Sequence, residues 1–228
     1  MERLIVLDTE TTGIEPSEGH RVIEVGAVQI LDREITELEF HRYLQPNRNV
    51  GESVNIHGIS DKFLRNKPQF SEISDDLIAF IEGATLVIHN APFDLGFLNN
   101  ELELAGDPRR LEDFCKVTDT LQLARELHPG QRNSLDALCR RYGVDNTGRT
   151  LHGALLDAEI LADVYLAMTG GQTELQLGGV SGQIGMDRQL RRSDSNAGRN
   201  FAIIPVSDEE LAAHRKWVEL LGESSVWN

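Results

Sequence analysis

The stretch that most constrains this chain is LIVLDTETTG, residues 4–13, in which an apolar run passes directly into acidic residues. Four consecutive apolar residues, ending at Leu7, are typical of a buried strand. Asp8 and Glu10 follow two positions apart, so on a strand both side chains project from the same face, with backbones about 6.6 Å apart. Two carboxylates this close repel each other unless a cation holds both ionised. The pattern therefore indicates either a cation site or a solvated strand end.

The remaining pattern predicts an α/β fold. Residues 3–8, 20–31 and 34–44 predict three strands, and the short turn at Leu31-Asp32-Arg33 favours antiparallel hairpins. A helix over 71–82 and a strand over 84–90 follow, and then helices over 92–104, 119–127, 133–142 and 153–168. Hairpins followed by strand–helix units predict a mixed sheet with helices packed against it.

Two later segments contain residues that can share a site with the strand carboxylates. Asp94 lies just inside the helix after the strand 84–90, where it either joins the site or only stabilises the positive end of the helix dipole. Asp157 lies among apolar residues, where a carboxylate is costly unless it is paired or binds metal. His152, five residues earlier, is about 140° away on an ideal helix, so the two meet most easily if His152 precedes the helix. The alternative is a capping histidine and a surface aspartate.

Together these segments supply four carboxylates and one imidazole. Oxygen ligands of this kind suit a hard divalent ion such as Mg²⁺. Two such ions can hydrolyse a phosphodiester, one by activating water and the other by stabilising the leaving oxygen. A histidine with a pKa near neutral suits removal of the proton from that water.

The charge and the cysteines limit the classes of function. The net charge is −15, and residues 1–169 hold 16 Lys and Arg against 29 Asp and Glu. Tight non-specific binding of nucleic acid needs cations at the phosphates, so we expect metal ions or another protein to hold an anionic substrate. Cys115 and Cys139 lack zinc-site spacing and are expected to be reduced thiols of a cytoplasmic protein. We expect no signal peptide and no membrane helix.

Three segments resemble, in order and spacing, the motifs of the DEDDh family of 3′→5′ exonucleases: Asp8-Thr9-Glu10-Thr11-Thr12-Gly13, Asn90 to Asp94, and His152 to Asp157. The resemblance covers residues 3–168 and implies a ribonuclease-H-like fold. It implies that Asp8, Glu10, Asp94 and Asp157 hold two Mg²⁺ or Mn²⁺ ions and that His152 is the general base. Asp163 matches no motif position and is expected to be structural or solvated.

The same resemblance implies a cleft for a single-stranded or frayed DNA 3′ end. Ile56-His57-Gly58-Ile59 resembles the loop beside the terminal nucleotide, Glu52 is expected to reach the terminal sugar, and Phe93 is expected to stack against a base. The alternatives are a surface loop for Glu52 and His57 and a core position for Phe93. The expected substrate contacts are Asp8, Glu10, Thr12, Ile14, Glu52, Ile56, His57, Asn90, Phe93 and Asp157.

The composition changes at Gly170. Residues 170–200 hold seven glycines and almost no aromatic or β-branched residues, which predicts a flexible linker. Gln172, Leu175 and Leu177 resemble a sliding-clamp-binding pattern, but it ends in leucine rather than an aromatic residue, so we expect weak clamp binding. An ordinary polar linker is the alternative.

The last segment, residues 201–228, contains a capping box at 207–210 and is too short to build a core of its own. Its apolar residues Trp217, Leu221 and Trp227 are expected to dock either on the domain itself or on a partner, and they resemble a polymerase-binding segment. We therefore expect an exonuclease domain over 1–169, a linker over 170–200 and a polymerase-binding segment over 201–228.

The whole chain resembles those family members that proofread for a bacterial replicative DNA polymerase by removing mispaired nucleotides. Two alternatives remain. One is a stand-alone exonuclease that trims RNA or repairs DNA, although the glycine-rich linker and the tryptophan-bearing tail are unusual for such a protein. The other is a scaffold that joins polymerase to clamp and has a vestigial nuclease site.

Overall fold

The computed structural model describes residues 2–148, 151–170, 212 and 216. All the helices and strands given below lie within residues 2–170. The predicted clamp-binding pattern at 172–177, the capping box at 207–210, and Trp217, Leu221 and Trp227 lie outside the described residues. Those assignments and the domain boundaries stay predictions.

A five-stranded mixed sheet forms the centre of the fold, with the strand order β3-β2-β1-β4-β5. The first three strands form the expected antiparallel hairpins: β1 (Arg3–Thr11), β2 (Val22–Leu31) and β3 (Glu34–Tyr43). β4 (Thr85–Ile88) pairs in parallel with β1, and β5 (Lys116–Asp119) pairs in parallel with β4. The predicted α/β class is confirmed, and β1 lies at the centre of the sheet.

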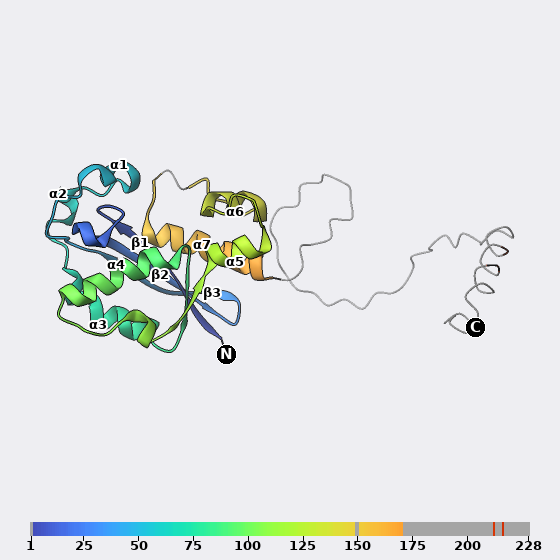
Figure 1. Ribbon diagram of the computed structural model, residues 1–228, viewed down its shortest axis with the longest axis horizontal. Helices are drawn as coiled ribbons and strands as arrows, with labels where there is room; N and C mark the ends of the chain where they lie inside the picture. Colours follow the sequence, from blue (N-terminus) through green and yellow to red (C-terminus); the bar gives the residue numbers. More distant parts are fainter. Residues whose placement is uncertain (1, 149–150, 171–211, 213–215, 217–228) are drawn as a thin grey trace, which may run out of the picture. The chain divides into compact units, whose positions relative to one another are not determined.

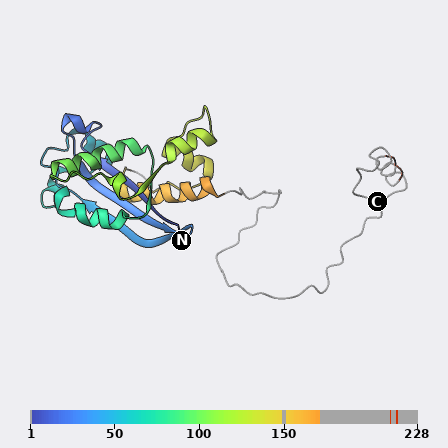
Figure 2. The ribbon, with the colours of Figure 1, turned by 60° about the horizontal axis from the view of Figure 1, so that its bottom comes forward.

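Helices cover both faces of this sheet (Figures 1 and 2). α3 (Phe70–Ile81) and α4 (Ala91–Leu104) pack on one face, and α7 (Ala154–Thr169) packs on the other. α5 (Thr120–Leu127) and α6 (Leu135–Tyr142) pack against α7. The shorter elements are α1 (Val54–His57), α2 (Asp61–Leu64) and three 3₁₀ turns, η1 (Pro16–Glu18), η2 (Gly51–Ser53) and η3 (Leu111–Asp113). No helix among the described residues has the length and apolarity that a membrane crossing requires.

The alternation of side chains along β1 decides which helix each later residue of the strand faces. Ile5 and Leu7 pack in the core beneath α3 and α4, whereas Leu4 and Val6 pack in the core beneath α7. Because side chains alternate along a strand, Asp8 and Glu10 belong to the face of α7. Thr9, between them, belongs to the face of α4.

A buried ion pair joins the start of β2 to α4. The Glu101 carboxylate is 1% exposed and accepts hydrogen bonds from Arg21 Nε at 2.7 Å and Nη2 at 2.6 Å. It also accepts one from the backbone N–H of Val22 at 3.0 Å. Since Val22 pairs with Thr11, this contact fixes the region of the sheet where β1 ends.

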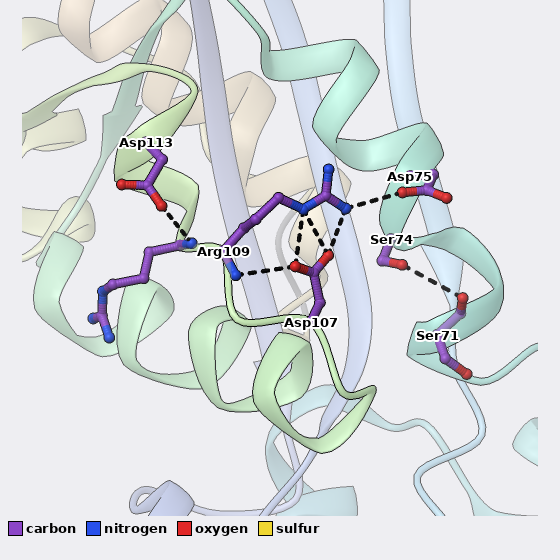
Figure 3. A network of polar contacts seen from close by, with 7 residues as sticks. Ser71, Ser74, Asp75, Asp107, Arg109 and Asp113 are labelled. Atoms are coloured by element: carbon purple, nitrogen blue, oxygen red, sulfur yellow. Dashed lines mark hydrogen bonds and ion pairs between the residues drawn. The ribbon is translucent and has the colours of Figure 1, made fainter.

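An exposed network fastens the connection after α4 to α3 (Figure 3). Arg109 donates hydrogen bonds to Asp107 and reaches Asp75 on α3 at 3.3 Å. These bonds from Arg109 lower the pKa of Asp107 to about 2. The side chains of Arg109 and Asp75 are 46% and 90% exposed, so these two charges face solvent, whereas Asp107 is 16% exposed.

Three features of the fold differ from the sequence expectation. β5 was not predicted, because it has four residues at a partly exposed sheet edge and shows no clear alternation. α1 and α2 are single turns, too short for helical periodicity to show. Asp119, expected to begin a helix, ends β5 and caps α5 by accepting from the N–H of Leu121 at 2.8 Å.

Candidate active site

The site forms where the end of β1 meets the start of α7, and Gly26 allows the two to approach. Gly26 pairs with Asp8 across β1 and β2, and a Cβ atom placed on it would lie 2.1 Å from the backbone nitrogen of Leu155. Any other residue would therefore push the first turn of α7 off the sheet. That turn carries Asp157, so the missing side chain brings a helix carboxylate to the strand carboxylates.

Glu10, His152 and Asp157 converge at this point. Each offers one ligand atom, and these atoms lie within 4.8 Å of one another. His152 Nδ1 is 3.4 Å from Asp157 Oδ2. His152 precedes Gly153, the N-cap of α7, which is the placement the spacing of the two residues favoured.

The burial of the three side chains fits a metal centre. Glu10 is 8% exposed and Asp157 is 3% exposed, so solvent does little to reduce their mutual repulsion. A hard divalent cation offsets such repulsion and prefers carboxylate oxygens. The His152 side chain, by contrast, is 48% exposed and lies where it can meet solvent water.

Asp8 and Asp94 do not belong to this group of three. Asp8 is half-buried on the same face of β1 as Glu10. Asp94, in the first turn of α4, is 2% exposed and accepts a hydrogen bond from Thr9 Oγ1 at 2.7 Å. Burial raises the pKa of Asp94 to about 7, although the bond from Thr9 acts in the opposite direction. A cation beside this carboxylate would favour its ionised form.

The loop predicted to contact the terminal nucleotide touches the loop that carries His152. The backbone N–H of His152 donates to the carbonyl of Ile56 at 3.2 Å, and the Leu151 side chain packs on Gly58. Ile56 is 55% exposed, whereas His57 is buried and its Nδ1 accepts from the N–H of Ile59 at 3.0 Å. His57 Nε2 is buried with no hydrogen-bond partner among the described residues, and burial lowers the pKa of the ring.

The other predicted substrate residues have varied surroundings. Ile14 is 75% exposed just after β1, and Glu52 is exposed in η2. The Thr12 hydroxyl is buried and accepts from the N–H of Arg21. Asn90 is exposed with a left-handed backbone (φ 69°) at the N-cap of α4. Phe93 packs against Phe97, with ring centroids 5.0 Å apart, and is partly buried against the core. It therefore has some of the contacts expected for a core position. The substrate roles of these residues stay predictions.

Two residues that build the site were missed by sequence reasoning. Gly26 interrupts an apolar strand, and a glycine inside a strand often marks a close approach of another backbone. Thr9 alternates with the two carboxylates, so its contact with the opposite helical layer follows from strand geometry.

Comparison with known proteins gives three results. The sequence pattern of the exonuclease family matches residues 5–165. The DNA polymerase III subunit epsilon of Escherichia coli (strain K12) is 49% identical, over 99% of this chain and 97% of its own length. That of Haemophilus influenzae is 45% identical, over 98% of this chain and 92% of its own length.

Solved structures share the fold of the domain. Exonuclease X in complex with 5′-overhanging duplex DNA is similar with a TM-score of 0.58 and 26% identity, covering 75% of this chain and 94% of its own. The nuclease domain of 3′hExo, a DEDDh family member bound to rAMP, has a TM-score of 0.63 and 20% identity, covering 73% of this chain and 91% of its own.

Proposed function

The chain belongs to the exonuclease family, and from that premise we propose that it is the proofreading 3′→5′ exonuclease of a bacterial replicative DNA polymerase. The observation that carries this proposal is the extent of the likeness. The epsilon subunits match 98–99% of the chain, including the segment after Gly170, whereas exonuclease X matches 75%. A stand-alone nuclease would not need that additional segment, so the likeness favours the polymerase-associated enzyme.

Enzymes of this family use divalent metal, and we propose two ions, Mg²⁺ or Mn²⁺, held by Asp8, Glu10, Asp94 and Asp157. The convergence of Glu10 and Asp157 within 4.8 Å and the raised pKa of buried Asp94 support this assignment. Metal bound there supplies charge stabilisation at the phosphate and acidifies a water molecule.

His152 acts as the general base in this proposal. Its Nδ1 faces Asp157, so the ring presents Nε2 to the attacking water, and its 48% exposure allows the proton to pass on to solvent. Asp157 then has two tasks, binding metal and orienting the imidazole. The contact of His152 with Ile56 fixes this base against the loop that receives the terminal nucleotide.

Attachment to the polymerase explains how so acidic a protein handles DNA. Repulsion between the acidic body and phosphates weakens capture of free DNA ends, while a tether provides a high effective concentration at the primer end. A mispaired end frays at lower cost than a paired one, so it reaches the site more often. We place this work in the cytoplasm, with the polymerase subunit as the main partner and the clamp as a weak one.

The test is the release of 3′ nucleotides from mispaired DNA, paired DNA and RNA primers, with and without Mg²⁺. We expect metal-dependent release that is fastest from the mispaired end. Asp8→Ala and His152→Ala should reduce turnover by at least about 100-fold, with unchanged circular dichroism. Asp163→Ala, which removes an exposed carboxylate from the same helix, should leave turnover unchanged. Near-normal turnover in the first two variants would refute the site assignment.

The tail is tested separately. Deleting residues 201–228 should abolish co-purification with the polymerase subunit but leave nucleotide release intact. Replacing Gln172 and Leu177 by alanine should weaken clamp binding alone. Unchanged polymerase binding after the deletion would contradict the proposed role of the tail.

A further inference from the structure

The segment from Arg42 to Lys67 reverses the charge of the rest of the domain. It contains five Lys and Arg against two acidic residues, whereas residues 1–169 as a whole carry 13 more acidic than basic residues. The segment includes η2, α1 and α2. A local excess of cations on so acidic a protein is a candidate anion site.

Two of these cations line a groove of about 390 Å³ formed with the loop after β3. Arg48 and Arg65 lie at the groove together with Gln45, Asn47 and Asn49. Of the other three cations, Arg42 stacks on Phe40, Lys67 lies 4.4 Å from the ring centroid of Phe63, and Lys62 is exposed on α2.

Among the described residues, neither Arg48 nor Arg65 forms an ion pair. Arg48 makes only a 3.4 Å contact with the carbonyl of Glu18, and Arg65 is exposed. The acidic residue of the groove, Asp61, already accepts a hydrogen bond from the N–H of Val50 at 2.9 Å. The groove therefore offers two guanidinium groups and several amides to an anion.

The groove lies close to the predicted nucleotide loop. Asp61 follows His57 by four residues, so their Cα atoms are at most about 14 Å apart, and α1 and α2 follow one another on the same side of the domain (Figure 1). Gly19, at the C-terminal end of η1, lies against Arg48. A strand whose 3′ end reaches His152 can therefore extend to this groove.

We propose that the groove binds a backbone phosphate of the DNA strand upstream of the scissile bond, through Arg48 and Arg65. The inference rests on the proposed function. The guanidinium fork suits a phosphate, and the amides add hydrogen bonds. An acidic protein segment would also complement the charges of Arg48 and Arg65. The groove is, however, continuous with the predicted nucleotide loop, which favours the DNA strand whose 3′ end occupies the active site.

The experiment measures binding by fluorescence anisotropy with the full chain carrying His152→Ala, so that DNA stays intact in Mg²⁺. The probes are 5′-labelled oligothymidylates of two and eight nucleotides. Arg48→Ala/Arg65→Ala should weaken binding of the octamer at least fivefold at low salt. It should lower the slope of log affinity against log salt by about 0.7, the contribution of one single-strand phosphate. Binding of the dinucleotide, which ends before the groove, should change less than twofold.

The matched control is Arg125→Ala/Arg140→Ala. It removes two exposed cations from α5 and α6, which pack against later turns of α7, and should change neither probe. An unchanged octamer affinity and salt slope in Arg48→Ala/Arg65→Ala would overturn the proposal. Equal losses for both probes would also overturn it, because the arginines would then act at the terminal nucleotide. Unchanged DNA binding with weakened polymerase binding would show a protein interface instead.

Cleavage of the unlabelled dinucleotide with His152 intact keeps the two proposals separate. If that protein cleaves neither the dinucleotide nor longer DNA strands, the proposed function fails, whatever the effect of the arginine variant on binding. If it cleaves both and the arginine variant binds the octamer normally, only the upstream phosphate site fails.

Discussion

Replacing Glu101 by alanine should be among the most damaging single changes to this domain, although Glu101 is not in the active site. The carboxylate is 1% exposed and satisfies two Arg21 nitrogens and the N–H of Val22. Its removal leaves a largely buried guanidinium and a buried backbone donor without that acceptor. Breaking one partner of a buried pair costs about 3–5 kcal/mol. We expect about 3 kcal/mol, because the Arg21 side chain is 21% exposed and water can partly replace the lost contacts.

The measurement is thermal unfolding of the full chain, followed by circular dichroism. For a domain of this size each kcal/mol lowers Tm by about 2–4 °C, so Tm should fall by roughly 6–12 °C. Glu103→Ala, which removes an exposed glutamate from the same helix, should change Tm by less than about 2 °C. Arg109→Ala, which opens the network of Figure 3, should also have little effect, because Arg109 is 46% exposed and solvent screens its charge.

A double-mutant cycle provides the refutation. If Arg21 and Glu101 act as a pair, Arg21→Ala should cost far less in a protein that already lacks Glu101, since the charge left unpaired is then removed. Additive losses would show that the two residues stabilise the domain independently. A Tm change for Glu101→Ala no larger than that of Glu103→Ala would show that solvent replaces the whole contact.

Two other predictions concern the site. Gly26→Ala should lower both Tm and metal affinity, the latter measured by calorimetry, because its Cβ would displace the first turn of α7; an unchanged metal affinity would contradict the role given to Gly26. In metal-free protein the raised pKa of Asp94 stabilises the fold fully below about 3.8, its usual value, and this contribution is lost as pH rises through about 7. The free energy of unfolding, measured with urea, should therefore fall by up to about 4 kcal/mol across that window. The fall should be smaller in Asp94→Asn, and divalent metal should restore part of the lost stability of the unmodified protein at pH 8. The same pH dependence in Asp94→Asn would assign it to another group.

The sequence predicted most of the fold because the long elements carry clear signals in their composition and at their ends, such as apolar runs and helix-starting residues. Residues 4–7 are apolar and buried in β1, and α7 begins next to His152 as the spacing of His152 and Asp157 favoured. β5 was missed because four residues at a sheet edge carry too little pattern. Single-turn helices such as α1 were missed for the same reason.

The sequence predicted that Glu10, His152 and Asp157 share a site, but it did not predict the geometry that brings them together. Side-chain alternation places Asp8 and Glu10 on one face, but it does not reveal which helix lies opposite. That depends on Gly26, whose effect appears only when two backbones approach each other in three dimensions. The raised pKa of Asp94 is likewise a consequence of burial by the α4 layer, which local sequence does not specify.

The end of β1 contacts both helical layers: Glu10 lies close to Asp157 on α7, and Thr9 donates a hydrogen bond to Asp94 on α4. The residues involved are separated by more than 80 positions in the chain on one side and more than 140 on the other. The centre is therefore complete only when β1, α4 and the start of α7 are all in place. Because large loops must close to bring them together, we expect a copy in which either helix is undocked to lack the assembled site.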